Sequence, residues 1–306
     1  MRLSVIALGL VCICAVVIGI AAPLQDEDDV RGAFLTSRPK EKPATSAAAK
    51  RPGRRPPKQP AGSTNPSNPS KPPEKKPATP GSSSKPSTPS ASTKPVNAPR
   101  IGLGMTLFMR DSNGLAVRVD PDHVFQKGDR VRVLLETNAD GYLYIFNTTN
   151  DGPAVMIYPN ADLDEAGNYI QAHVPFEIPT SQSAEERLRW FAFDETAGTE
   201  RLLFVFTREP LSGVPIEDEL IAFCRESKES CRVKPSNEVW AAVQKDMQAP
   251  LKTDKTQQIA GPQTATEQQA STRGLGLAKT DPEPSLVMMA STPRSTLVAT
   301  LDLIHK

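Results

Sequence analysis

A proline-rich, basic segment constrains the fold of this chain more than any other feature of the sequence. Residues 38–100 contain 16 of the 30 prolines and almost no large apolar side chain. A segment of this composition cannot bury enough apolar surface to offset the entropy lost on ordering the chain. We therefore expect residues 25–100 to be a disordered linker of mixed polyproline-II and coil character, so that only residues 101–306 build a core.

The same segment is strongly basic, with 14 Lys and Arg against two Glu in a chain whose net charge is +1. Two interpretations stay open. The charges keep a spacer solvated, or they bind an anionic envelope surface, to which each basic residue contributes at most about 1 kcal/mol. The segment has no interleaved aromatic residues, and this argues against nucleic acid as a partner.

The N-terminus has the pattern of an export signal. Met1 and Arg2 precede the uncharged, mostly apolar run 3–24, and an acidic run follows at 26–29. This charge bias places residues 25 onward outside the cytoplasm, in the periplasm or cell envelope. Small residues in "GIAAP" (19–23) suit cleavage of a signal peptide, whereas the length of the run suits an uncleaved transmembrane anchor. Both interpretations of residues 1–24 remain open, and the second would associate the chain with the membrane through residues 3–24.

Two of the four cysteines, Cys224 and Cys231, lie close together in "FCRESKESCR". In an exported chain we expect them to form a disulfide, and two unpaired thiols are the alternative. A zinc site would need further ligands, and the three histidines are scattered along the sequence. The sequence therefore predicts no metal and no cofactor.

A stretch at 128–160, "GDRVRVLLETNADGYLYIFNTTNDGPAVMIYPN", has the pattern of a sheet. Val131, Val133 and Leu135 alternate with charged residues, as in a half-buried strand. Residues 142–146 are apolar on both faces, which indicates a central strand. Turn residues at 138–141 and 150–152 separate these runs from each other and from a third run at 154–158. We expect three antiparallel strands joined by short turns.

The remaining sequence extends this pattern to seven or more short strands. The predicted fold class is mainly β: an antiparallel β-sandwich, Ig-like in general architecture, with one to three short helices. We expect the core at 101–225, a loose connection at 249–272, and a last strand at 296–305 in which alternate residues are apolar. The helices are expected from Ser183, from Pro215 to near Cys224, and across the apolar residues Val239, Trp240, Val243 and Met247.

Three motifs in order, the stretch above, then "NYIQAHVPFEIP" and "GTERLLFVFTREPL", resemble a bacterial family called domain of unknown function 4384. The resemblance covers roughly residues 125–211, and the C-terminal strand is also similar to the end of some longer members. It implies an exported or envelope-associated accessory domain with no catalytic residues to carry over. The shared turn and strand motif falls on Gly141, Tyr142, Tyr144, Gly152, Pro159 and Asn160.

The sequence contains only weak signals for metal-binding or catalytic sites. "DLDEAG" at 162–167 imitates the start of a calcium loop, but Ala166 and His173 stand where the fifth and twelfth ligands belong. Glu185, Glu186, Asp194 and Glu195 could supply a glycosidase pair, although acids are common on solvated surfaces. The aromatic residues Trp190, Phe191 and Phe193 fit the core better than a contact surface. The sequence therefore predicts a protein that is not an enzyme, with no catalytic, cofactor or metal residues.

The expected function is that of a non-catalytic binding or interaction module of the bacterial cell envelope. Its partner would be a peptide, a glycan or an envelope protein, held by loops or by a strand edge. Two alternatives stay open: a structural tether that spans the envelope through the proline-rich spacer, and an accessory envelope hydrolase.

Overall fold

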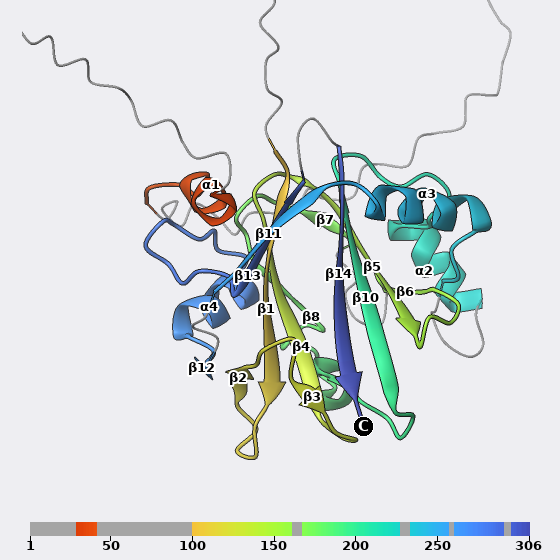
Figure 1. Cartoon of the computed structure of the whole chain (residues 1–306), viewed down its shortest axis with the longest axis horizontal. Coiled ribbons are helices and arrows are strands. Elements are labelled where there is room, and N and C mark those ends of the chain that lie inside the picture. Colours follow the sequence, from red (N-terminus) through yellow and green to blue (C-terminus); the bar gives the residue numbers. More distant parts are fainter. Residues whose placement is uncertain (1–28, 42–99, 161–166, 227–232, 257–259, 291–294) are drawn as a thin grey trace, which may run out of the picture.

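Two β-sheets packed face to face form the body of the protein in the computed structural model (Figure 1). The structure describes residues 29–41, 100–160, 167–226, 233–256, 260–290 and 295–306. Its strands are β1 (Gly102–Arg110), β2 (Ala116–Arg118), β3 (Val124–Phe125), β4 (Arg130–Thr137), β5 (Gly141–Thr149), β6 (Val155–Tyr158), β7 (Tyr169–Ile170), β8 (Phe176–Ile178), β9 (Phe191–Ala192), β10 (Gly198–Thr207), β11 (Leu251–Lys255), β12 (Gly261–Pro262), β13 (Leu286–Ala290) and β14 (Thr296–His305).

The first sheet is built around β1. This strand pairs antiparallel with β4 on one side and with β13 and β2 on the other. β11 extends the sheet beyond β13, β12 extends it beyond β2, and β8 and β9 pair with the far side of β4. We call it the β1 sheet.

The second sheet has the order β3-β14-β10-β5-β6, with β7 also on β5. β10 pairs with β14 over ten residues and with β5 over eight, so it is the central strand. All pairs are antiparallel except β14 with β3, which are parallel. We call it the β10 sheet, and its long C-terminal strand confirms the expectation that residues 296–305 return to the sheet.

The main core lies between the two sheets. Period-two alternation directs one face of each long strand into it: Leu143 and Ile145 from β5, Leu202, Phe204 and Phe206 from β10, and Leu297, Ala299, Leu301 and Leu303 from β14. They meet residues of β1 and β4, all almost fully buried. The predicted β-sandwich is confirmed.

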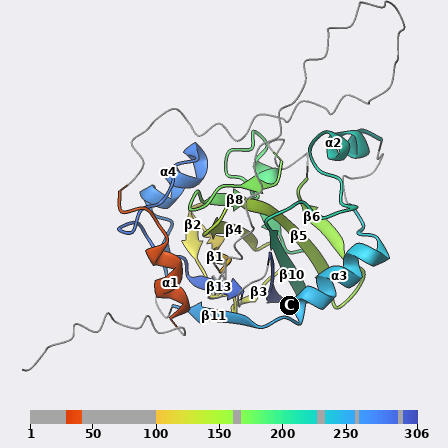
Figure 2. The same cartoon turned by 90° about the horizontal axis from the view of Figure 1, so that it is seen from above.

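Helices cover the outer faces of both sheets. α2 (Glu217–Glu226) and α3 (Asn237–Met247) pack on the β10 sheet over Tyr144, Phe146 and Val205. α1 (Val30–Thr36) packs on β13, and α4 (Ala265–Arg273) lies near β8. Figure 2 shows α1 and α4 on one side of the sandwich and α2 and α3 on the other. The described residues thus contain four α-helices, one more than the upper limit of the prediction.

Several expectations about the connections are wrong. β4 and β5 do not form a hairpin, because β4 pairs within the β1 sheet and β5 within the β10 sheet. The residues from 138 to 140 therefore cross between the sheets. β5 and β6 do pair antiparallel, and the turn between them has positive φ at Asn150 and Asp151. Near Ser183 the structure has only the 3-10 turn Glu186–Arg189, whose preceding residue, Glu185, makes no side-chain cap bond.

Residues 249–272, predicted to be loose, instead hold β11, β12 and most of α4. β11 pairs over its full length with β13, and Thr264 and Glu267 form a capping box that starts α4. Short polar segments of this kind are ordered by pairing with distant strands and by caps, so their composition alone does not reveal them.

The linker prediction is wrong for its first part. Residues 29–41 are ordered on the β1 sheet, where Val30 and Phe34 of α1 are buried against Val287 and Met289. Residues 1–28 and 42–99, which include the predicted signal or anchor and most of the linker, lie outside the described residues. Within the described ranges, no helix is long and apolar enough to cross a membrane.

Candidate functional site

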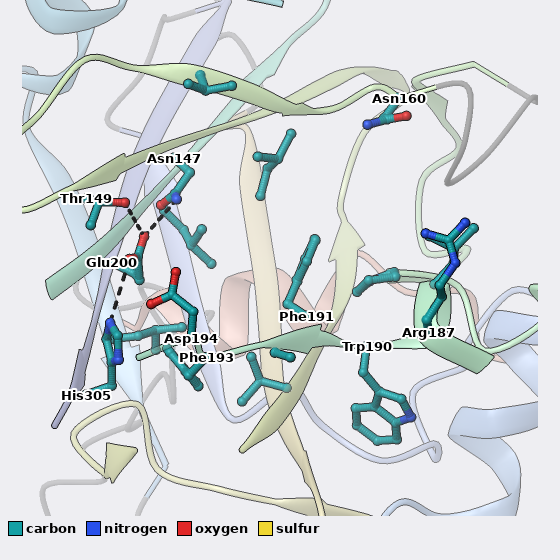
Figure 3. A pocket seen from close by; sticks show the side chains of 18 of the residues that line it. Asn147, Thr149, Asn160, Arg187, Trp190, Phe191, Phe193, Asp194, Glu200 and His305 are labelled. Atoms are coloured by element: carbon teal, nitrogen blue, oxygen red, sulfur yellow. Dashed lines mark hydrogen bonds and ion pairs between the residues drawn. The ribbon is translucent and has the colours of Figure 1, made fainter. Parts of the chain in front are cut away.

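A cavity opens between one end of the β10 sheet and the segment 187–194. Its volume is about 620 Å³, within the range of small-ligand sites. Its walls combine side chains of β5, β6, β10 and β14 with those of β9 and its neighbours (Figure 3). At this end of the sandwich the inward face of the β10 sheet changes from apolar to polar residues.

The polar residues occupy the same alternate positions along each strand as the inward-facing apolar residues. Asn147 and Thr149 continue the inward row of Leu143 and Ile145 on β5, and Glu200 precedes Leu202 on β10. His305 continues the inward row of β14. Strand pairing then brings the four residues together. Thr149 on β5 lies opposite Glu200, and on the other side of Glu200 lies Leu303, two residues before His305 on β14.

Hydrogen bonds tie this polar group into one cluster. Glu200 Oε2 accepts from Asn147 Nδ2 at 2.8 Å and from Thr149 Oγ1 at 2.9 Å. His305 Nε2 lies 3.7 Å from Glu200 Oε1. Figure 3 shows these side chains on one side of the cavity, with Asp194 beside them. We call Asn147, Thr149, Asp194, Glu200 and His305 the polar cluster.

Part of this cluster has unsatisfied hydrogen-bonding capacity. His305 is 2% exposed, and neither of its ring nitrogens has a hydrogen-bond partner among the described residues; the same is true of Asn147 Oδ1. A buried polar group without a partner costs about 1–3 kcal/mol. These three atoms have almost no accessible surface, so they lie behind the cavity wall, in side chains that also line it.

Aromatic and apolar side chains form the rest of the wall. Phe193 stacks on Phe125 with ring centroids 4.7 Å apart and lies 5.0 Å from the ring of His305. Phe191, Leu202 and other apolar side chains also line the cavity, and Figure 3 shows Phe191 between the polar cluster and Trp190. The stacked rings fix the position of the imidazole, so the polar cluster has a rigid apolar support.

Arg187 and Trp190 lie on the opposite side of the cavity from the polar cluster (Figure 3). Arg187 is exposed and donates to Glu185 at 2.7 Å. The guanidinium of Arg132 lies 4.0 Å from the Trp190 ring centroid, a cation–π contact. Burial lowers the pKa of Arg132, opposed by the nearby Glu177 carboxylate. Trp190 is therefore held between the core and a buried cation.

The residues of the predicted turn and strand motif are structural. Gly141 begins β5, where a Cβ atom would lie 2.3 Å from the carbonyl oxygen of Thr207. Tyr144 is fully buried and its hydroxyl accepts from Leu211 N at 3.0 Å; burial raises its pKa. Tyr142 packs edge-on to Tyr169. None of these three lines the cavity.

The second half of the motif lies at the cavity. Gly152 and Asn160 line it, and Pro159 is buried between Tyr158 and Asn160. Gly152 closes the predicted turn, because its N–H donates to the carbonyl of Thr149 at 2.9 Å, and the residues with positive φ in that turn are Asn150 and Asp151. The motif thus frames one wall of the cavity with turn and strand-end residues.

The structure does not bring the four proposed glycosidase acids together. Glu185 pairs with Arg187, Glu186 with Arg110, and Glu195 with Lys127. Only Asp194 lines the cavity, where its neighbour among the acids is Glu200. The three aromatic residues combine both roles: Trp190 and Phe193 are buried and Phe191 packs against the main core, and all three also line the cavity.

A second group of hydrogen-bonded polar side chains attaches α1 to the β1 sheet. Arg38 donates to both carboxylate oxygens of Glu136, at 2.8 and 2.6 Å, and to three backbone carbonyls near the end of α4 and beyond. His173 Nδ1 lies 2.8 Å from Glu136 Oε1, and its Nε2 lies 3.0 Å from Ser37 Oγ. We call Ser37, Arg38, Glu136 and His173 the α1 clip.

The clip contains a hydroxyl, an imidazole and a carboxylate in line, the order found in serine hydrolases. Its other contacts favour docking over catalysis. The Ser37 hydroxyl donates to the carbonyl of Phe34, and Arg38 engages both carboxylate oxygens. The backbone N–H groups of Ser37 and Arg38 donate to Phe34 and Leu35 carbonyls, so they are not free to stabilise an oxyanion.

Other predicted sites fall at the limits of the described residues. Cys224 is on α2, but Cys231 lies outside those residues, so the disulfide stays a prediction. The calcium-like stretch is also outside them, apart from Gly167. Within the described ranges, no three His, Cys, Asp or Glu side chains group as metal ligands.

Comparison with known proteins supports the resemblance found in the sequence. A model of the family described as domain of unknown function (DUF4384) matches residues 124–210, which run from β3 to the end of β10. The match omits β1 and β14, which are long strands of the two sheets. No match was found among curated proteins or among solved structures.

Proposed function

We propose that the protein is a non-catalytic binding module of the bacterial cell envelope that takes a small ligand, or part of a larger one, into the cavity. The observation that supports this most is the cavity itself. It joins an apolar, aromatic wall to the polar cluster, the usual composition of a ligand site. A peptide or a glycan fragment is the kind of ligand that we expect in this cavity.

The envelope location is part of the proposal and is supported by the sequence. The basic residue before the apolar run and the acidic residues after it favour export, with the domain outside the cytoplasm. The mature N-terminus, measured by mass spectrometry of the purified full chain, tests this. A start at Ala22 or Pro23 would indicate a cleaved signal, and an intact Met1 in the membrane fraction would indicate an anchor.

Blocking the cavity tests the binding function. The variant Val155→Trp places a large ring at the cavity wall, whereas Met247→Trp changes an exposed residue of α3. Each full-length protein is incubated with fragments from digested envelope and examined by native mass spectrometry. We expect bound fragments on the wild type and on Met247→Trp, and none on Val155→Trp. Equal occupancy of both variants, or no adduct on a folded wild type, would contradict the proposal.

A structural tether is less well supported than binding. With α1 docked, residues 42–99 connect two points of one folded domain, 41 and 100, and do not separate the domain from the apolar N-terminal run. The accessory hydrolase also lacks a supporting observation, because the contacts of the α1 clip favour docking.

A further inference from the structure

The charge of the cavity is uneven along its length. Two carboxylates, those of Asp194 and Glu200, line the end that holds the polar cluster. The one Lys or Arg side chain among the described lining residues is that of Arg187, which lies across the cavity and pairs with Glu185. A ligand group that enters the polar end therefore meets negative charge that no lysine or arginine of the wall neutralises.

The polar cluster is also rich in hydrogen-bond acceptors. Glu200 Oε2 already accepts two bonds, but Oε1 faces only the His305 ring, at 3.7 Å. The carboxylate of Asp194 is exposed, and among the described residues it accepts one bond, from Thr196 N at its Oδ1. An ammonium group has three donors and no acceptor, so it complements such a cluster.

We infer that the polar cluster binds a primary ammonium group, carried on an apolar or aromatic body that lies along Phe191 and Leu202. This inference rests on the proposed binding function and names the chemical class of its ligand. The ammonium group lies against Glu200 and Asp194, and the body covers the apolar middle of the cavity. The Glu200 side chain is 21% exposed, so an ion pair there is partly shielded from water and is stronger than one on an open surface; Asp194 is exposed and contributes less.

The geometry disfavours other polar head groups. A carboxylate or phosphate would meet two like charges at this end, and like-charge contact disfavours binding. A neutral hydroxyl would find acceptors but would leave both carboxylates uncompensated. An ammonium group neutralises the negative charge of the two carboxylates and also donates hydrogen bonds to their oxygens.

Two matched probes test the inference on the full-length protein. 2-Phenylethylamine and 2-phenylethanol have the same aromatic body and differ in the head group. We expect isothermal titration calorimetry at pH 7 to show that the amine binds at least about tenfold more tightly than the alcohol. Equal affinity of the two probes would overturn the inference.

Variants locate the effect at the polar cluster. Glu200→Gln removes the charge but keeps an oxygen that can accept from Asn147 and Thr149. Asp194→Asn removes the charge at an exposed position and keeps an oxygen that can accept from Thr196 N. We expect each to weaken amine binding several-fold and to leave alcohol binding unchanged. Glu219→Gln, an exposed glutamate on α2, serves as the control and should bind the amine as the wild type does. Unchanged amine affinity in both Glu200→Gln and Asp194→Asn would also overturn the inference.

The outcomes separate this inference from the proposed function. If both probes bind equally and Val155→Trp abolishes both, the cavity is a binding site but does not select ammonium groups. If neither probe binds the folded wild-type protein and no envelope fragment does, both proposals fail.

Discussion

Gly141 shows how one residue without a side chain sets the approach of two strands. A Cβ atom there would lie 2.3 Å from the carbonyl oxygen of Thr207 and 2.8 Å from two ring carbons of Phe206. The nearest obstacle is backbone, which cannot move without moving β10. Close approach of the chain, not a positive φ, therefore requires glycine at this position.

The variant Gly141→Ala should destabilise the fold by at least about 2 kcal/mol, since β5 and β10 would have to separate locally. Urea unfolding followed by circular dichroism measures the change. Ser212→Ala, in the exposed turn after β10, is the control and should stay within about 0.5 kcal/mol of the wild type. A Gly141→Ala protein as stable as this control would show that the strands can separate at little cost.

Tyr144 contributes through its hydroxyl as well as its ring. The hydroxyl accepts from Leu211 N at 3.0 Å, and this bond ties the segment after β10 to β5. Tyr144→Phe leaves that N–H without its partner, so we expect a loss of about 1–2 kcal/mol in urea unfolding. Tyr142→Phe, at a half-buried position, should cost less. The reverse order of the two variants would contradict the importance given to this bond.

The polar cluster could have been found in the sequence with one added step. Asn147, Thr149, Glu200 and His305 each occupy a position where strand parity calls for an apolar inward residue. A polar residue that continues an inward apolar row is a signal of a site. The sequence could not show that the three rows end at the same place, because this depends on the register of β5, β10 and β14.

At the scale of elements, β14 shows that period-two alternation in the sequence predicts both a strand and its buried face. Leu301 and Leu303 alternate with exposed residues, and the structure places them and Leu297 in the main core as predicted. Long, regular strands reveal their state in the sequence because one face is buried along the whole element.

Adjacent residues of β14 give a sharp test of this alternation. Leu301 is buried between the sheets, while Thr300 is exposed on the outer face. Leu301→Asp buries a charge without a partner and should cost more than about 4 kcal/mol or prevent folding. Thr300→Asp should change the stability by less than about 1 kcal/mol. Thermal unfolding of the two proteins compares them directly, and similar losses in both would refute the strand register.

The connections between elements could not be predicted in the same way. Asn138, Asp140 and Gly141 are favourable hairpin residues, yet the chain crosses from one sheet to the other there. β11 and β12 are short and polar, and each is defined by the strand that it pairs with, β13 or β2. Local sequence carries little information about a partner that lies far along the chain.

At the scale of the whole molecule, the α1 clip attaches an N-terminal segment that the sequence did not distinguish from the linker. Arg38 is fully buried and reaches Glu136, 98 residues away. In the sequence it is one more basic residue at the edge of a proline-rich segment. Its carboxylate partner on β4 and the carbonyls near 278–282 only come together in the fold.

The variant Arg38→Met should release residues 29–41 and leave the sandwich folded. It removes a bidentate ion pair and leaves Glu136 without its main partner, which is costly while the carboxylate stays buried. Hydrogen exchange should show lost protection at Ala33, whose N–H bonds to Asp29, and unchanged protection in β14. Lys40→Met, at an exposed position, is the control.

A double variant tests whether the charge is responsible. Combining Arg38→Met with Glu136→Leu removes both members of the ion pair, and such replacements are often neutral. We expect protection of α1 to return at least in part. Full protection of Ala33 in the single variant would show that Val30, Phe34 and the bonds of Arg31 to Asp254, Pro284 and Ser285 suffice to hold α1.

Docking of α1 has a mechanical consequence. If the chain is pulled between its N-terminal run and its C-terminus, the load first reaches the fold at residue 29, so it acts on the clip and on Phe34. Residues 42–99 carry no tension until these contacts rupture. Rupture would then add about 200 Å of contour length in one step. The contacts of α1 thus set the force at which the chain first extends, and residues 42–99 set the length of that extension.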